Sequence, residues 1–520
     1  MRRGREPANQ HTLNSPEPDR YHSALKRGAL FNLLGVVARL VQPLYVLSVT
    51  WLWGPSVTGL YLLAQSLVEI VFGGITAGYT DATTIFGSRH AEPSESDPGE
   101  RRALYRVLSN TLGVTAGLAL LAAAVTQVAA RTVVMRVFPG YAELLPGLHV
   151  LAWSLVPRTI GQIAVASTKA MMRMEHDAML LGFVHPLLML GGCFVTYVLG
   201  GGITGLLSVQ LVVDAIVCVL AVRAMGRYYS LAELSRALRE FEFDRDLLGF
   251  SIPQSMNLTF NRYIARLDGI MLASSGLGQA ELGYFGTAAL LTSNIAQIRL
   301  VFSGALAPVI ARHHIRGERA AIRDALSMVA RWTTSLAVPA ILAALVLRKD
   351  ILHLISHSYG EHSGFVALLL IPPFTSCAYG MAGACLMFTG HSRITLVNSF
   401  CVAILNTGFT YLLIPRYGMT GAALATALAT SITTGLQMLE LSRYEQVAIS
   451  WRAVWRPHFG LAIGLGVLAL LWDPVDLPFP GRMATAFALT VGYAALMLAL
   501  RQEDALLLAR RLIGRPVPTV

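Results

Sequence analysis

Long apolar runs separated by short polar turns are the feature that most constrains what this sequence can fold into. The runs are about 20 residues long, which is the length that carries a helix across the hydrocarbon core of a bilayer. Only 14% of the residues are charged, whereas soluble domains have about a quarter. No strand-like alternation competes with the runs, so the predicted fold class is all-α, a polytopic membrane protein.

About fourteen membrane-spanning helices are predicted, in two pseudo-symmetric bundles followed by two C-terminal helices. Their approximate limits are 28–52, 58–86, 105–130, 144–168, 178–199, 203–225, 248–273, 280–308, 325–347, 364–389, 392–414, 420–441, 454–472 and 483–500. A weak internal repeat supports the bundles, because a shift of 223 residues places Tyr61 on Tyr284 and Arg39 on Arg262. The predicted domains are a disordered cytoplasmic tail (1–24), a first bundle (25–227), an amphipathic cytoplasmic linker (228–246), a second bundle (247–445) and two extra helices with a tail (446–520).

The basic residues are distributed unevenly between the two sides of the predicted membrane. With the N-terminus inside, about 29 Lys and Arg residues lie on the cytoplasmic side and about six on the other. This asymmetry follows the positive-inside rule, so both termini are predicted to be cytoplasmic. The net charge of +11 is spread over many connections rather than gathered in one patch. Nucleic acid is therefore excluded as a partner, and anionic lipids are expected at the basic connections.

The predicted span Phe250–Ala273 carries three charges near its middle, at Arg262, Arg266 and Asp268. A charge at this depth costs a few kcal/mol, so such side chains normally face a cavity or a partner. Arg262 and Arg266 are one helical turn apart and therefore share a face. Asp268 is predicted to pair with Arg266 or Arg39, and a role as a gate or ion-coupling residue is the alternative.

Taken together, the charges within the predicted spans are more often basic than acidic, which favours an anionic ligand such as a diphosphate. Arginine suits this ligand because its planar guanidinium group binds phosphate through two hydrogen bonds and keeps its charge when buried. The candidate substrate-binding residues are Arg39, Arg158, Arg262, Arg266 and Arg299. A structural ion pair remains an alternative for each of them. Glu69 and Asp214 are candidates for gating or ion coupling, with a structural hydrogen bond as the alternative.

Neither a cofactor nor a metal site is predicted. The five cysteines lie in apolar runs without the spacing of metal ligands. The histidine-rich segment His353–His362 lies in a predicted external connection, where histidines four residues apart could bind zinc, but no metal site is predicted there. No connection is long enough to fold as a catalytic domain, so a membrane glycosyltransferase, polymerase or ligase is not expected.

Two sequence blocks resemble the oligosaccharide flippases of the MOP (multidrug/oligosaccharidyl-lipid/polysaccharide) superfamily. The first block is GFSIPQSM, followed by LDGIMLASSGLGQAELGYF; the second is TGHSRITLVNSFCVAILNTGFTYLLIPRYGMTGAALATALATSI. The second block contains the Gly-x-x-Arg turn of the family at Gly390–Arg393 and its Leu-Ile-Pro-x-Tyr-Gly turn at Leu413–Gly418. The resemblance covers nearly the whole chain after the N-terminal tail.

The resemblance implies an alternating-access carrier without covalent chemistry. It would move undecaprenyl-diphosphate-linked oligosaccharide from the cytoplasmic to the periplasmic leaflet of the bacterial inner membrane, for lipopolysaccharide or exopolysaccharide synthesis. The arginines would bind the diphosphate, and a polysaccharide polymerase and export machinery are the implied protein partners. A multidrug or small-molecule cation antiporter of the same superfamily and a transport-inactive scaffold are the alternatives.

Overall fold

A computed structural model describes residues 41–88, 98–171, 173–353, 363–470 and 477–500. The regular elements in these ranges are all helical. Their bounds are α2 Val41–Trp53, α3 Pro55–Ser88, α4 Pro98–Val137, η1 Pro139–Tyr141, α5 Leu144–Ala170, the π-helical η2 Asp177–Val184, α6 His185–Val198, α7 Ile203–Met225, α8 Leu231–Arg239, α9 Arg245–Ser274, α10 Gln279–Ser293, η3 Asn294–Ala296, α11 Gln297–Ile315, α12 Arg319–Val346, α13 Arg348–His353, α14 Gly364–Leu369, α15 Ile371–Tyr379, α16 Met381–Phe388, α17 Ser392–Tyr444, α18 Trp451–Leu470 and α19 Phe479–Ala499. The predicted N-terminal tail, Arg39 and residues 501–520 lie outside the described ranges.

The predicted all-α membrane fold is confirmed, whereas the number of about fourteen spans stays a prediction. Among the described residues, eight helices are long and apolar enough to cross a membrane, or nine if one bent pair counts as a single span. Most of the predicted span 28–52 lies outside the described ranges. The predicted spans 392–414 and 420–441 follow one another within α17, which is interrupted at Gly418 (φ 53°, ψ −129°).

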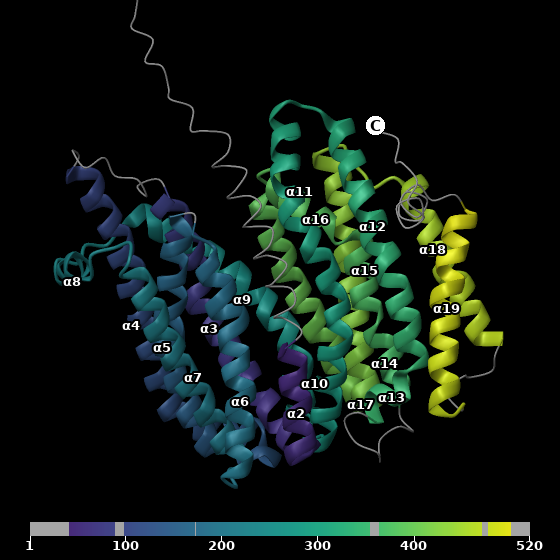
Figure 1. Ribbon diagram of the computed structural model, residues 1–520, viewed down its shortest axis with the longest axis horizontal. Helices are drawn as coiled ribbons and strands as arrows, with labels where there is room; N and C mark the ends of the chain where they lie inside the picture. Colours follow the sequence, from purple (N-terminus) through teal and green to yellow (C-terminus); the bar gives the residue numbers. More distant parts are fainter. Residues whose placement is uncertain (1–40, 89–97, 172, 354–362, 471–476, 501–520) are drawn as a thin grey trace, which may run out of the picture.

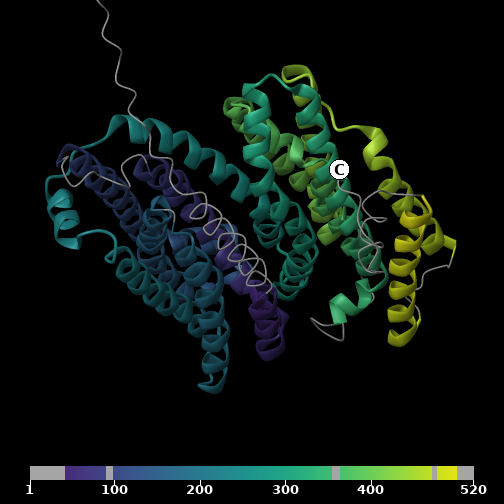
Figure 2. The same cartoon turned by 45° about the horizontal axis from the view of Figure 1, so that its top comes forward.

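The helices form two groups, and α9 passes between them (Figure 1). In the first group α2–α7 pack on one another, and in the second group α10–α17 do so. Helix α9, teal in Figure 2, crosses from the first group to the second, and it contacts both α3 and α17. Helices α18 and α19 pack against α12 at the edge of the second group.

The predicted amphipathic linker contains the short helix α8. Ser230 caps its start by accepting a hydrogen bond from the backbone N–H of Glu233. Leu234 is buried, and Arg101 at the start of α4 pairs with Glu233 at 2.9 Å. The helix is therefore fastened to the first group through α4, while the predicted domain boundaries themselves stay predictions.

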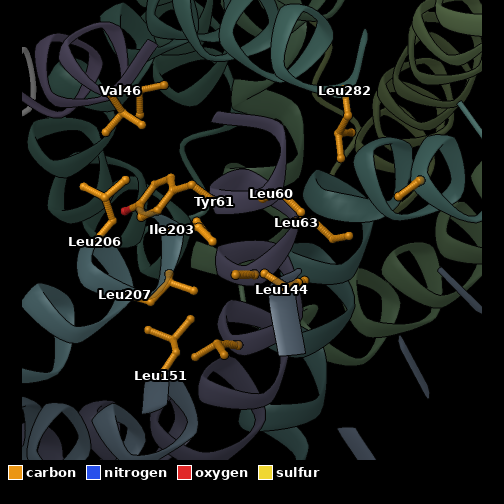
Figure 3. Close-up of a cluster of buried hydrophobic side chains, with 14 of the residues drawn as sticks. Val46, Leu60, Tyr61, Leu63, Leu144, Leu151, Ile203, Leu206, Leu207 and Leu282 are labelled. Carbon is orange, nitrogen blue, oxygen red and sulfur yellow. The ribbon is translucent and has the colours of Figure 1, made fainter. Parts of the chain in front are cut away.

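The two groups share one apolar core at one end of the molecule. We call this the outer end, following the predicted topology, and the opposite one the inner end. Figure 3 shows side chains of this core from the first group, together with Leu282 of α10. Phe285 of α10 and Phe365 of α14 belong to the same cluster. Toward the inner end the groups have separate clusters, around Leu108 in the first and Leu326 in the second. Apolar packing thus joins the groups mainly at the outer end.

Glycines on α3 allow α9 and α10 to approach closely. A Cβ atom at Gly59 would lie 1.9 Å from the carbonyl oxygen of Gln279 on α10. Toward the inner end, a Cβ atom at Gly78 would lie 2.0 Å from the carbonyl oxygen of Ser251 on α9. The backbone N–H of Gly78 also donates to Ser255 Oγ at 3.0 Å. Small residues that let two backbones meet are a usual means of helix association within membranes.

Replacing Gly78 by Ala tests this close approach. The added methyl group has no room beside Ser251, so we expect a loss of stability of about 1–3 kcal/mol, as for other overpacked sites. Thermal unfolding of the purified protein in detergent measures the change. Gly117→Ala is the matched control, because nothing lies within 4 Å of its added Cβ atom. Equal effects of the two substitutions would contradict the close approach.

Candidate functional site: a glutamate held by two arginines

Glu69 of α3 accepts hydrogen bonds from two arginines on different helices. Arg262 Nη1 of α9 lies 2.9 Å from Glu69 Oε2. Arg158 Nη2 of α5 donates to the other carboxylate oxygen, Oε1. We call these three residues the Glu69 ion cluster. Since α3 and α5 belong to the first group, the cluster ties α9 to that group.

The sequence around Glu69 explains how α3 accommodates both guanidinium groups. Phe72 and Gly73 follow Glu69 by three and four residues and therefore share its face of the helix. The guanidinium carbons of Arg158 and Arg262 lie 4.1 Å and 5.4 Å from the centre of the Phe72 ring, within cation–π range. A Cβ atom at Gly73 would lie 2.5 Å from Arg262 Cδ, so a larger residue there would displace the arginine.

The Glu69 ion cluster is largely shielded from solvent and keeps a positive charge. The side chains of Glu69, Arg158 and Arg262 are 18%, 20% and 35% exposed. An unpaired charge in such a place costs several kcal/mol, so each member depends on the others. Because the cluster contains two guanidinium groups and one carboxylate, its net charge is one positive charge. The cluster therefore attracts a further anion rather than a cation.

Arg266 increases this positive charge. It lies one turn after Arg262 on α9, is partly exposed, and acts electrostatically on Glu69. Within the described ranges it forms no ion pair of its own. Three of the five predicted arginines, Arg158, Arg262 and Arg266, are thus brought to one place, and Arg39 lies outside the described residues.

Arg299 does not join them. It lies on α11 in the second group, where its Nε donates to Ser376 Oγ of α15 at 3.0 Å. A Cβ atom at Gly380 would lie 3.2 Å from Arg299 Cδ, so the side chain is also closely packed. These contacts agree with the structural alternative for Arg299.

The expected pairing of Asp268 with Arg266 is wrong for the described part of the chain. Asp268 Oδ2 instead accepts a hydrogen bond from Thr426 of α17, in the second group. The other oxygen, Oδ1, is buried and has no hydrogen-bond partner. This pair does not form because residues two apart on a helix point about 200° away from each other around its axis. The other predicted partner of Asp268, Arg39, lies outside the described residues. A carboxylate with a free oxygen inside the protein is a place where a proton or a small cation can bind.

Asp214 lies in a polar pocket inside the first group. Its Oδ1 is 3.2 Å from His185 Nε2, and Gln210 Nε2 donates to its Oδ2 at 2.9 Å. The pocket has a volume of about 110 Å³, and Arg158 and Gln162 also line it. Both carboxylate oxygens of Asp214 therefore have partners, and the pocket adjoins the Glu69 ion cluster through Arg158.

Neutral hydrogen bonds close the outer end between the groups. The hydroxyl of Tyr141 donates to the carbonyl oxygen of Leu277 at 3.0 Å, and Gln279 Nε2 donates to that of Gly140 at 2.8 Å. Burial, with a smaller effect of the nearby Glu281 carboxylate, raises the pKa of Tyr141 to about 12, so it remains a donor at neutral pH. No pattern in the sequence predicts these bonds.

The described residues contain no group of three or more His, Cys, Asp or Glu side chains that could hold a metal ion. His353 ends α13, and most of the histidine-rich segment after it lies outside the described ranges.

Comparison with known proteins agrees with the fold. Residues 108–362 match the family described as "Polysaccharide biosynthesis protein". The probable low-salt glycan biosynthesis flippase Agl15 of Haloferax volcanii is 22% identical over 312 residues, or 58% of this chain and 63% of Agl15. The structure of the lipid II flippase MurJ, inward closed, matches with a TM-score of 0.67 and 12% identity over 90% of this chain and 98% of MurJ. An inward-facing multidrug resistance MATE family transporter of the MOP superfamily matches with a TM-score of 0.63 and 16% identity. The match covers 79% of this chain and 98% of the transporter.

The chain has the fold of the MOP superfamily. The resemblance stated from the two sequence blocks is thereby confirmed. The matched region spans less than two thirds of the length of Agl15. These proteins are named as flippases and transporters, in keeping with the prediction of a carrier rather than an enzyme.

A double-mutant cycle tests the Glu69 ion cluster. Glu69→Gln leaves two guanidinium groups without a counter-charge, so we expect a loss of about 3 kcal/mol, the low end for a broken buried ion pair. Arg262→Gln on the Glu69→Gln background should cost less than it does alone, because the pair is already broken. Thermal or denaturant unfolding gives the coupling energy, expected above about 1 kcal/mol for residues in contact. Strictly additive losses would mean that the two side chains do not interact.

Proposed function

We propose that this protein is a flippase that moves a polyprenyl-diphosphate-linked oligosaccharide, with undecaprenyl as the expected carrier, across the bacterial inner membrane. In this proposal Arg158, Arg262 and Arg266 bind the diphosphate. The observation that carries it is the excess positive charge held around Glu69 where the two groups of helices meet. The similarity to a glycan biosynthesis flippase and the fold shared with a lipid II flippase support it.

Competition between Glu69 and the diphosphate links binding to movement. Glu69 occupies the guanidinium groups of Arg158 and Arg262 as a phosphate oxygen would. A diphosphate carries more charge and more acceptor oxygens than one carboxylate, and arginine binds phosphate through two parallel hydrogen bonds. The arriving diphosphate therefore draws Arg262 away from Glu69. Glu69 thus acts as a gate, because α9 loses its charged tie to the first group and the two groups can change their relative orientation.

The proposed cellular context follows from the distribution of basic residues. Both termini lie in the cytoplasm, and the basic connections at the inner end meet anionic lipids. The flipped glycan serves surface polysaccharide synthesis, so a polysaccharide polymerase and export machinery would act after this protein.

One observation favours a cation-binding role as the second candidate. Asp268 Oδ1 is buried without a hydrogen-bond partner, which suits a proton or a small cation. The polarity of the Glu69 ion cluster opposes a cationic drug as cargo, because its one acid is bound by two arginines. We therefore assign Asp268 to ion coupling within the flippase rather than to drug export. Asp214 is a weaker candidate, since both of its oxygens have partners.

Flipping by the purified protein in vesicles tests the diphosphate site. Arg158→Gln and Arg262→Gln should each lower the rate of polyprenyl-diphosphate-oligosaccharide flipping by about tenfold or more, the factor for one lost charge-assisted hydrogen bond. Arg299→Gln is the matched control, and we expect it to change the rate little at equal protein amounts. Wild-type rates in both cluster variants would overturn the assigned diphosphate site.

Depletion of the protein in its native cell tests the substrate class. Lipid-linked glycan should accumulate in the cytoplasmic leaflet, and surface polysaccharide should be lost. An unchanged leaflet distribution together with increased drug sensitivity would favour the antiporter alternative instead.

Asp268→Asn tests ion coupling. The amide cannot carry the negative charge, so flipping should lose its stimulation by a sodium or proton gradient while the rate without a gradient persists. The measurement is the ratio of rates with and without each gradient in reconstituted vesicles. Thr426→Val, which removes only the hydroxyl that donates to Asp268, should reduce the ratio less. An unchanged ratio in Asp268→Asn would exclude this residue as the coupling site.

A further inference from the structure

We propose that an apolar groove between α4 and α9 holds the polyprenyl chain of the substrate while its diphosphate lies at the Glu69 ion cluster. The inference rests on the proposed function and adds to it a second binding site of different chemistry. The occupant is the isoprenoid chain of the lipid-linked sugar.

The walls of the groove are apolar and come from α4 of the first group and from α9, which passes between the groups. Leu118 of α4 forms one wall, and Ile252, Met256 and Phe260 of α9 form the other. The three α9 residues are spaced four apart and therefore make one stripe along the helix. The groove has a volume of about 340 Å³, and Ile252 and Met256 are half exposed. Its mouth thus faces outward from the helices rather than into a closed core.

The floor offers few hydrogen-bonding groups to a sugar. It consists of Gly74 and Tyr79 of α3 with Ser255 and Thr259 of α9. Ser255 Oγ already accepts the backbone N–H of Gly78 at 3.0 Å, and Thr259 Oγ1 donates to the backbone oxygen of Ser255 at 2.6 Å. Because the Ser255 and Thr259 hydroxyl groups already have backbone partners, the Tyr79 hydroxyl is the remaining polar group of the floor. The groove therefore suits a hydrocarbon chain better than a glycan.

The groove ends beside the Glu69 ion cluster. On α9, Thr259 precedes Arg262 by three residues and so lies one turn away on the same face. On α3, Gly74 is next to Gly73, which contacts the side chain of Arg262. An apolar surface and a positively charged site therefore adjoin on both helices. A ligand that fits both is an amphiphile with an anionic head and a hydrocarbon chain.

The depth of the cluster separates this ligand from an ordinary phospholipid. Glu69 lies fourteen residues into α3, or about 21 Å from its outer end at 1.5 Å per residue. A phospholipid keeps its phosphate at the membrane surface, so its chain does not start at this depth. In contrast, a lipid whose diphosphate has entered the protein has a hydrocarbon chain that begins at this depth. The groove extends from Arg262 toward the inner end, which matches uptake from the cytoplasmic leaflet.

Photolabelling tests the inference on the full-length protein in vesicles. The probe is a polyprenyl diphosphate with a diazirine in its chain, and a phospholipid with the same group in its acyl chain is the comparison. We expect the prenyl probe to label Leu118, Ile252 or Met256, and unlabelled polyprenyl diphosphate to suppress that labelling. Equal labelling by the phospholipid, without suppression, would make the groove an ordinary lipid contact and overturn the inference.

Filling the groove gives a second readout. Met256→Trp should lower prenyl labelling and flipping about tenfold, the factor expected when about two methylene groups lose their burial. Met387→Trp on α16, at a similarly exposed methionine, is the matched control and should leave both unchanged.

Arg262→Gln separates the two proposals. If it abolishes flipping while Met256→Trp does not, the groove is wrong and the flippase stands. If neither variant affects flipping, both the groove and the assigned diphosphate site are wrong; if the wild-type protein does not flip the lipid-linked sugar at all, the proposed function itself fails.

Discussion

A single carboxylate that binds two guanidinium groups holds together the centre of this protein. Glu69 brings Arg158 and Arg262 to one place, and none of the three charges could remain there alone without a cost of several kcal/mol. The arrangement also depends on the absence of a side chain at Gly73, which leaves room for Arg262. The contact between α3 and α9 is thus fixed by charge at its middle and by close backbone packing at Gly78.

In the proposed function, the same interaction makes the centre responsive to a ligand. The two arginines that bind the Glu69 carboxylate can bind a phosphate instead, because carboxylates and phosphates both offer oxygen acceptors to arginine. The groove beside Arg262 adds a chemically opposite surface within one helical turn. Neither part alone distinguishes a lipid-linked sugar from other molecules, since an anion site accepts any anion and an apolar groove accepts any chain. In the proposal, their adjacency selects a molecule whose anionic head is bonded directly to a hydrocarbon chain.

The fold was predictable because the length and composition of each apolar run identify a membrane-spanning helix without information about the rest of the chain. The shared face of Arg262 and Arg266 was predictable for the same reason, since it depends only on local spacing. The partner of Glu69 was not, because Arg158 and Arg262 are 89 and 193 residues away in the chain and no local pattern encodes that contact. The hydrogen bond between Asp268 and Thr426 was not predictable either, since Thr426 is an ordinary residue of an apolar run.

The closure at the outer end has a consequence for how the chain can change over evolutionary time. Tyr141 and Gln279 donate to backbone oxygens of Leu277 and Gly140, and a backbone oxygen is present whatever the side chain. Mutations at the acceptor positions therefore leave these bonds intact, whereas the donors Tyr141 and Gln279 must be kept. Glu69 has no such freedom, because its partners are side chains. Among descendants of this sequence, the charges at the centre should change only together.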